Sequence, residues 1–235
     1  MIQCRQQKLS SIVDKLRVGI SEINRRYRRG PDLYFYRRVF ELRSQADSVA
    51  SFLGQDYNIE MLYATLVAWD MNSRAAKMKY FDDFKDNLLS TVNELQTFER
   101  LFINGGDIRS NASFKQLRSI YTRLCLMKSH SKLVSNSKML HFLFPNILTP
   151  MDRRNSLHFF YGNHDESIDK YIEIVDLTFE ILLMPDEWSV HLDTGWNTSI
   201  PKMIDNAILL IEQHSLIEVQ PVQREMLADA GLRST

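Results

Sequence analysis

Apolar residues recur along the chain at steps of three and four positions, the spacing that places side chains on one face of an α-helix. The first such stripe lies in the segment 5–28, where Leu9, Ile12 and Leu16 are followed by further apolar positions at the same spacing. Comparable stripes, bounded by glycine, proline or capping residues, continue to about position 214. We therefore predict helices over residues 5–28, 32–53, 59–71, 82–102, 113–127, 135–144, from 152 onward, 167–184 and 200–214.

No segment alternates apolar and polar residues with the period of two that a half-buried strand requires. The sequence therefore predicts an all-α fold, a compact multi-helix domain of about eight or nine helices with no significant sheet. The clearest break, an Asn-Gly-Gly sequence at 104–106, indicates an N-terminal helical subdomain over 1–104 and a C-terminal one over 105–219. A single domain over 1–219 is the alternative, and 220–235 is expected to be a weakly ordered tail.

Composition narrows the class of protein. Hydrophobic residues make up 44% of the chain, which supports a real core. No apolar run approaches the roughly 20 residues of a membrane-spanning helix, and the first residues lack the apolar core of a secretion signal. We expect a cytoplasmic protein without a membrane partner. Cys4 and Cys125 are the only cysteines, so we expect neither a disulfide framework nor a cysteine-based metal site.

Charge is distributed unevenly, although the net charge is zero. The segments 1–45 and 110–154 each carry a net charge of +7, whereas 46–109 carries −4 and 155–235 carries −10. One interpretation is an anion-binding face for DNA, RNA or a phosphorylated ligand. The other is that basic and acidic helices pack beside one another. The candidate phosphate contacts in the second basic segment are Arg118, Arg123, Lys128 and Lys132.

The segment 132–162 combines helix signals with candidate chemistry. The Ser-Asn-Ser sequence at 135–137 predicts a helix start, because short polar side chains accept hydrogen bonds from free backbone N–H groups, and Lys138 follows it directly. Pro145 is expected to end that helix. Asp152 is expected to cap the next one, so the lysine and the aspartate would stand at the starts of two consecutive helices.

Lys138 and Asp152 are the candidate catalytic residues. A lysine becomes a nucleophile when burial or a neighbouring cation lowers its pKa, and an aspartate serves as a base or stabilises a cation. The alternative roles are a phosphate-contacting or surface lysine and a simple helix cap. The candidate ligand or phosphate contacts in this segment are Ser137, Lys138, His141, Arg153 and Arg154.

Common cofactor and metal motifs are absent from the sequence. It contains no dinucleotide fingerprint, no phosphate-binding P-loop, no HExxH and no GxSxG. The histidines at positions 130, 141, 158 and 164 match no standard metal-ligand spacing. We therefore expect no metal and no cofactor.

Two sequence patterns carry a resemblance to known proteins. The pattern S-K-x-L-H-F-L-x-P-x-x-x-x-P-x-D-R over 137–153, together with LYATLVAWDMNSRAAKMKYFDDF over 62–84, is similar to a group of uncharacterised bacterial all-helical proteins. The segment 132–162 also looks distantly like the helix-hairpin-helix DNA glycosylase superfamily. That resemblance implies that Lys138 matches the lysine at the start of the family's helix and Asp152 its catalytic aspartate. The hairpin glycines of that family are absent here, and the interval between the two residues is short.

Three hypotheses for function follow. The first is binding of nucleic acid or a phosphorylated ligand through the basic face of 110–154. The second is a DNA glycosylase- or lyase-like enzyme that uses Asp152 and Lys138. The third is an interaction or dimerisation module, in which basic and acidic segments pair between two subunits of a homodimer.

Overall fold

The computed structural model describes residues 2–18, 20–27, 29–72, 77–103, 107–184 and 186–213, and well over half of these are helical. In chain order the helices are α1 (Ile2–Val18), α2 (Ser21–Arg26), α3 (Pro31–Gln45), α4 (Val49–Leu53), α5 (Asp56–Ala68), α6 (Phe81–Leu89), α7 (Val92–Ile103), α8 (Asn111–Arg123), α9 (Leu133–Leu143), the π-helical turn η1 (Arg153–Leu157), α10 (His158–Tyr161), α11 (Ile168–Leu182), the 3₁₀-helix η2 (Asp186–His191) and a last helix over 200–213. Within these ranges no strand forms, and one isolated antiparallel bridge joins Met78 to Met127. The prediction of an all-α fold is confirmed. No described helix has the length and apolar character needed to cross a membrane.

The described residues contain twelve α-helices, more than the predicted eight or nine. Three predicted helices are each broken in two, giving the pairs α1 and α2, α3 and α4, and α6 and α7. One break has a clear local cause. Ser48 and Ser51 form a capping box in which each hydroxyl accepts from the other's backbone N–H, at 3.0 and 3.1 Å, so a new helix begins after Ser48. At the end of α6, the Ser90 and Thr91 hydroxyls donate to carbonyl groups of the last turn at 2.7 Å.

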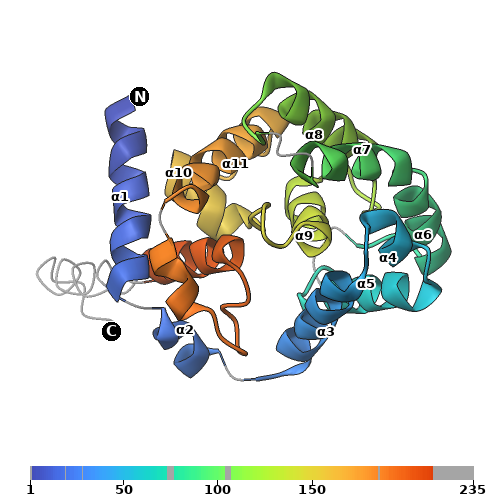
Figure 1. Cartoon of the computed structure of the whole chain (residues 1–235), viewed down its shortest axis with the longest axis horizontal. Coiled ribbons are helices and arrows are strands. Elements are labelled where there is room, and N and C mark those ends of the chain that lie inside the picture. The colour runs from blue at the N-terminus through green and yellow to red at the C-terminus, as the bar shows by residue number, and fades with distance from the viewer. Residues whose placement is uncertain are drawn as a thin grey trace, which may run out of the picture.

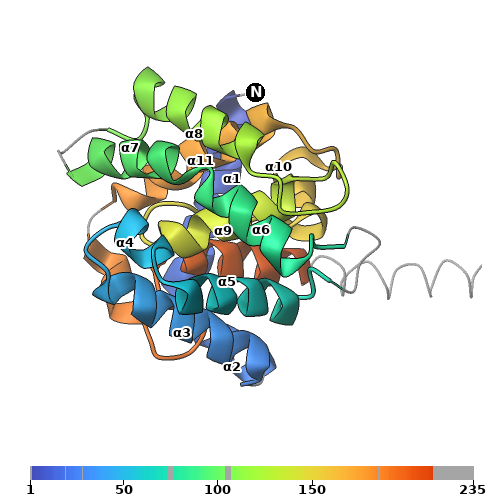
Figure 2. The same cartoon turned by 90° about the vertical axis from the view of Figure 1, so that its right-hand side faces the viewer.

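Helix α9 lies near the middle of the molecule (Figure 1). Helices α3 and α5 pack on one part of it and α11 on another. The perpendicular view shows the same arrangement, with α9 flanked by α5 below and α11 above (Figure 2). Neighbouring helices surround α9, which lies within the segment 132–162. This helix is therefore the central helix of the core.

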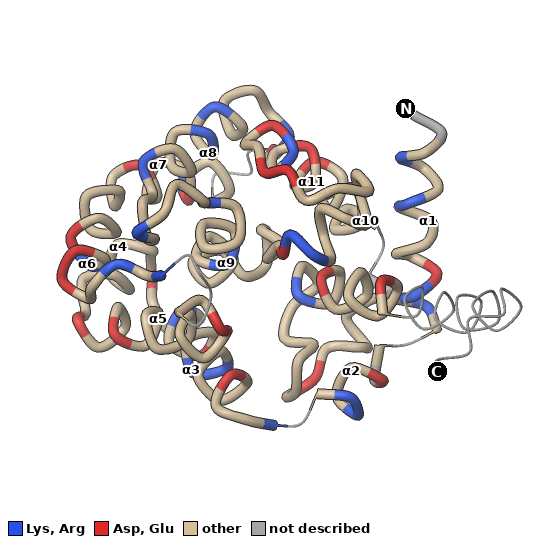
Figure 3. The backbone as a smooth tube through the Cα atoms, turned by 180° about the vertical axis from the view of Figure 1, so that it is seen from behind, with Lys and Arg blue, Asp and Glu red and all other residues tan. Residues whose placement is uncertain are grey.

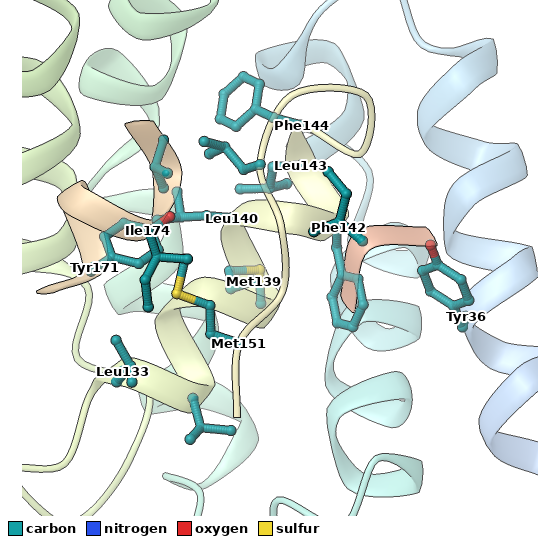
Figure 4. Packing of buried hydrophobic residues seen from close by; sticks show 14 of the residues in the cluster. Tyr36, Leu133, Met139, Leu140, Phe142, Leu143, Phe144, Met151, Tyr171 and Ile174 are labelled. Atoms are coloured by element: carbon teal, nitrogen blue, oxygen red, sulfur yellow. The ribbon is translucent and has the colours of Figure 1, made fainter. Parts of the chain in front are cut away.

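All eleven residues of α9 are buried. Tyr171 and Ile174 of α11 lie against one side of the helix, and Tyr36 of α3 lies towards the other side (Figure 4). Polar residues at such a position need internal partners, because an unpaired buried polar group is unfavourable. Asn136 meets this requirement by donating to the carbonyls of Tyr121 and Leu124, at 2.9 and 3.1 Å.

The predicted subdomain boundary at 104–106 and the predicted tail over 220–235 lie outside the described residues. Helices that precede and follow the boundary pack together, since α7 contacts α8 and α1 contacts α11. Buried apolar residues from both sides belong to one cluster.

Candidate functional site

The start of α9 differs from the prediction. The helix begins at Leu133, so Lys138 lies in its middle and not at its start. The sequence at 135–137 is not the cap. The carboxylate of Glu166, distant in sequence, accepts the backbone N–H groups of Lys132 and Leu133 at 3.2 and 3.3 Å. Because a remote carboxylate caps these free N–H groups, the local Ser-Asn-Ser signal was misleading.

Asp152 is a helix cap, as predicted. Its Oδ1 accepts the backbone N–H of Arg154 at 2.8 Å, and its own N–H donates to Ser156 Oγ at 3.0 Å. The element that it caps is the π-helical turn η1, which continues into α10. The carboxylate is therefore held in one place at the start of η1.

Ser137 fixes the position of Asp152 relative to α9. It is fully buried, and its Oγ accepts the backbone N–H of Met151 at 3.1 Å. This bond ties the chain just before Asp152 to the turn of α9 that carries Lys138. Ser137 was predicted to contact a ligand or phosphate, but in the structure its buried hydroxyl is engaged within the core.

Lys138 and Asp152 line one cleft of about 330 Å³. Its walls come from α2, the start of α3, the end of α5, α9, the start of η1, the segment around Trp196 and the last helix. The charged lining residues are Asp32, Asp70, Lys138, Asp152, Lys202 and Asp205. Asp70 has a positive φ of 65°, in the left-handed region that aspartate tolerates better than most residues. Arg154 is exposed and does not line the cleft.

Two indoles and two lysines form the inner wall of the cleft. Lys138 Nζ lies 5.3 Å from the ring centroid of Trp69, and Lys202 Nζ lies 5.2 Å from the same ring and 5.6 Å from that of Trp196. Both lysines are largely buried, at 8% and 5% exposure. Lys202 is paired with Asp205 at 2.5 Å. The indole faces attract the ammonium groups, which helps to retain two cations in a partly desolvated position.

His141, which was predicted to contact a ligand, belongs to the buried core. Its side chain is fully buried, and burial lowers its pKa to about 3. Nδ1 must donate to the Leu148 carbonyl, 2.7 Å away, because a carbonyl only accepts. Nε2 of the neutral ring then accepts from Tyr36 Oη at 2.8 Å, and Thr198 Oγ1 donates to the same phenol at 2.6 Å.

This chain of hydrogen bonds connects the two sides of the cleft. It runs from α9 through α3 to the segment 196–199, which carries Trp196. The Tyr36 and Trp196 rings are stacked with centroids 6.5 Å apart. The neutral histidine is therefore a positioning residue for the wall that holds Trp196.

The cations predicted to form one basic face are largely occupied within the chain. Arg118 pairs with Asp169 at 2.6 Å, and Arg123 pairs with Glu94. Lys132 Nζ donates to a backbone carbonyl. Lysine and arginine positions on α8 lie beside acidic positions on α11 (Figure 3).

The remaining members of the predicted face are also spread out. Lys128 Nζ lies 3.6 Å from the Tyr80 ring centroid, and Arg153 pairs with Glu166. Lys138 is buried in the cleft, away from these exposed side chains. The interpretation in which basic and acidic helices pack together explains these pairs without a second subunit.

Three further residues of the cleft, Lys202, Asp205 and Trp196, could not be identified from the sequence. Lys202 and Asp205, three positions apart on the last helix, showed only an ordinary pattern of helical surface charge. Nothing in the sequence placed Trp196 against Trp69. No group of three or more histidine, cysteine or acidic side chains among the described residues is arranged to hold a metal ion.

A scan against protein-family models, a search of curated proteins and a search of solved structures each returned no match.

Proposed function

We propose that the cleft binds a nucleotide, either free or as one unit of a nucleic acid strand. The observation that carries this proposal is the convergence of Lys138 and Asp152, from two different elements, on one cleft that also contains two indoles. A nucleobase is planar with a polar edge, so indole rings suit its faces and carboxylate or amide groups suit its edge. The lysine ammonium groups suit a phosphate.

The size and charge of the cleft narrow the ligand class. A volume of about 330 Å³ lies at the lower end of the range for small-molecule pockets, roughly 300 to 1,000 Å³. Four aspartates against two lysines disfavour a highly charged ligand. We therefore expect nucleosides or nucleoside monophosphates to bind more tightly than the corresponding triphosphates.

Intrinsic fluorescence provides a direct test, because two of the three tryptophans line the cleft. Trp188, the third, is buried and does not line it. Titration with nucleosides, nucleoside monophosphates and triphosphates should give a saturable change in emission for the first two classes. Asp152→Asn should weaken the response, whereas Arg118→Gln, outside the cleft, should preserve it. No saturable change with any of these ligands would contradict the proposal.

A glycosylase- or lyase-like activity is the second candidate, favoured by the half-buried carboxylate of Asp152 in the same cleft as Lys138. An enzyme of this class takes one base out of the stack into a pocket. In this scheme Asp152 stabilises positive charge on the sugar as the base departs or removes a proton from water, and Lys138 acts as nucleophile or phosphate contact.

This candidate predicts release of a base from DNA that contains a mismatched or damaged nucleotide. Asp152→Asn should abolish release and keep the fold, since asparagine caps helices well. Lys138→Met should remove any strand nicking. If the wild-type protein releases no base from a panel of damaged duplexes but still binds nucleotides, the cleft is a binding site and not a glycosylase centre.

A further inference from the structure

A second groove lies on the exposed face of α3, the helix whose first turn also supplies Asp32 to the cleft. It has a volume of about 370 Å³ and is lined by Arg29, Gly30, Leu33, Tyr34, Arg37, Arg38 and Glu41. Tyr34, Arg37, Arg38 and Glu41 follow the helical spacing that places side chains along one stripe of a helix. The stripe begins two residues after Asp32, which lines the cleft.

Charge in this groove is not balanced as it is on α8. Arg29 makes no ion pair with any described residue. Arg37 and Arg38 share a single carboxylate, Glu41, at 3.9 and 3.5 Å, and their side chains remain 35% and 38% exposed. Three guanidinium groups therefore face one carboxylate.

An exposed aromatic ring completes the groove. Tyr34 is 66% exposed, although it lies in a helix whose buried face supplies Leu33, Tyr36 and Val39 to the core. Its ring packs edge to face on Phe35 with centroids 5.5 Å apart, which leaves an outer face available. An exposed ring between arginines is the combination that single-strand binding surfaces use, since every base can stack and every phosphate can pair.

We propose that this groove binds the backbone and one base of a single-stranded nucleic acid whose next nucleotide enters the cleft. This inference rests on the proposed function, which identifies the ligand as a nucleotide or nucleic acid. It places the phosphate contacts at the start of and along α3, and not in the segment 110–154. Arg29, Arg37 and Arg38 contact phosphates, and Tyr34 stacks on a base. The first turn of α3 supplies Asp32 to the cleft and Leu33 and Tyr34 to the groove, which is the observation that links the two sites in this proposal.

The test compares two triple variants that remove the same number of positive charges. The groove variant carries Arg29→Gln, Arg37→Gln and Arg38→Gln. The control variant carries Lys115→Gln, Arg118→Gln and Lys128→Gln, all within the basic segment 110–154 that the sequence first suggested. Both are measured against a fluorescent oligothymidine of about 12 nucleotides, a length within the usual site sizes of single-strand binders.

The expected result is a change in both affinity and salt dependence for the groove variant alone. Three phosphate contacts on a single strand give a slope of about −2 in a plot of log affinity against log salt, or roughly 20-fold between about 50 and 200 mM. The plot for the groove variant should therefore be shallower than that for the wild-type protein by about this amount. Tyr34→Ala should weaken binding at least about 5-fold, whereas Tyr34→Phe should retain it.

Several outcomes would overturn the inference, and they are separable from failure of the proposed function. Unchanged oligonucleotide binding in the groove variant, or an equal loss in the control variant, overturns it even if mononucleotides still quench the tryptophans. No oligonucleotide binding by the wild-type protein also overturns it. A poly-glutamate peptide that binds as tightly as the oligonucleotide would also overturn the inference, because the groove would then bind acidic chains in general. A further outcome is that the groove variant alone loses oligonucleotide binding while mononucleotides cause no change in tryptophan emission. That result would contradict nucleotide binding in the cleft and would support nucleic acid binding in the groove.

Discussion

At the scale of single residues, Asp152 both caps η1 and lines the cleft. Its carboxylate accepts the N–H of Arg154 and lines the cavity that holds Lys138. These roles respond differently to substitution. Asp152→Asn keeps an oxygen that can cap, whereas Asp152→Ala removes it and should lower stability by about 1 kcal/mol.

Thermal unfolding separates the two roles. A loss of about 1 kcal/mol should lower the Tm of a chain of this size by roughly 2 to 4 °C in the alanine variant, with little change in the asparagine variant. Nucleotide binding should weaken in both. An asparagine variant that melts and binds like the wild type would reduce Asp152 to a structural cap.

His141 predicts a pH dependence of stability. Burial lowers its pKa to about 3 in the folded protein, against 6.5 for an ordinary histidine. The unfolded chain therefore binds more protons than the folded one between these values, so stability is full above pH 6.5 and falls as the pH drops towards 3. The slope contributed by this one group approaches 1.4 kcal/mol per pH unit.

Denaturant unfolding between about pH 7 and pH 5, where most carboxylates remain ionised, isolates this histidine. His141→Gln should be less stable at neutral pH and should show a flatter dependence over that interval. His130→Gln, which alters an exposed histidine, is the control. A wild-type slope that survives in the His141 variant would contradict this assignment.

At the scale of elements, the sequence predicted those boundaries whose signals are local. The Gly30-Pro31 junction starts α3, Pro145 follows the end of α9, and Asp152 caps η1. The sequence missed breaks made by short polar turns inside long apolar stripes. It also misplaced the start of α9, since the group that caps this helix, Glu166, is thirty-three positions away from Leu133.

Glu166 therefore controls the start of the central helix. Its carboxylate accepts from the backbone of Lys132 and Leu133 and pairs with Arg153. Glu166→Ala should raise hydrogen exchange at the first turn of α9 and destabilise the protein by about 1 to 2 kcal/mol. Asp165→Ala, at the exposed neighbouring position, is the matched control. Equal exchange in the two variants would show that α9 starts without this carboxylate.

At the scale of the whole molecule, ion pairs account for much of the alternation of charge along the sequence. Arg5 of α1 and Arg109 of the segment before α8 both pair with Asp176 of α11, at 2.5 and 2.6 Å. Such pairing depends on the folded arrangement, so composition alone could not separate a basic binding face from internal pairing. For the same reason the sequence supplied Lys138 and Asp152 but not Lys202, Asp205 or the stacked position of Trp196.

The central claim is that Lys138 and Asp152 act on one ligand in one cleft. A double-mutant cycle tests it with Lys138→Met, Asp152→Asn and the combined variant, using the affinity for the nucleoside monophosphate that gives the strongest tryptophan response. Two groups that share a ligand should be coupled by about 0.5 to 3 kcal/mol, so the combined loss should differ from the sum of the single losses. Single losses that add within about 0.3 kcal/mol, or variants that bind as the wild type does, would contradict a shared site.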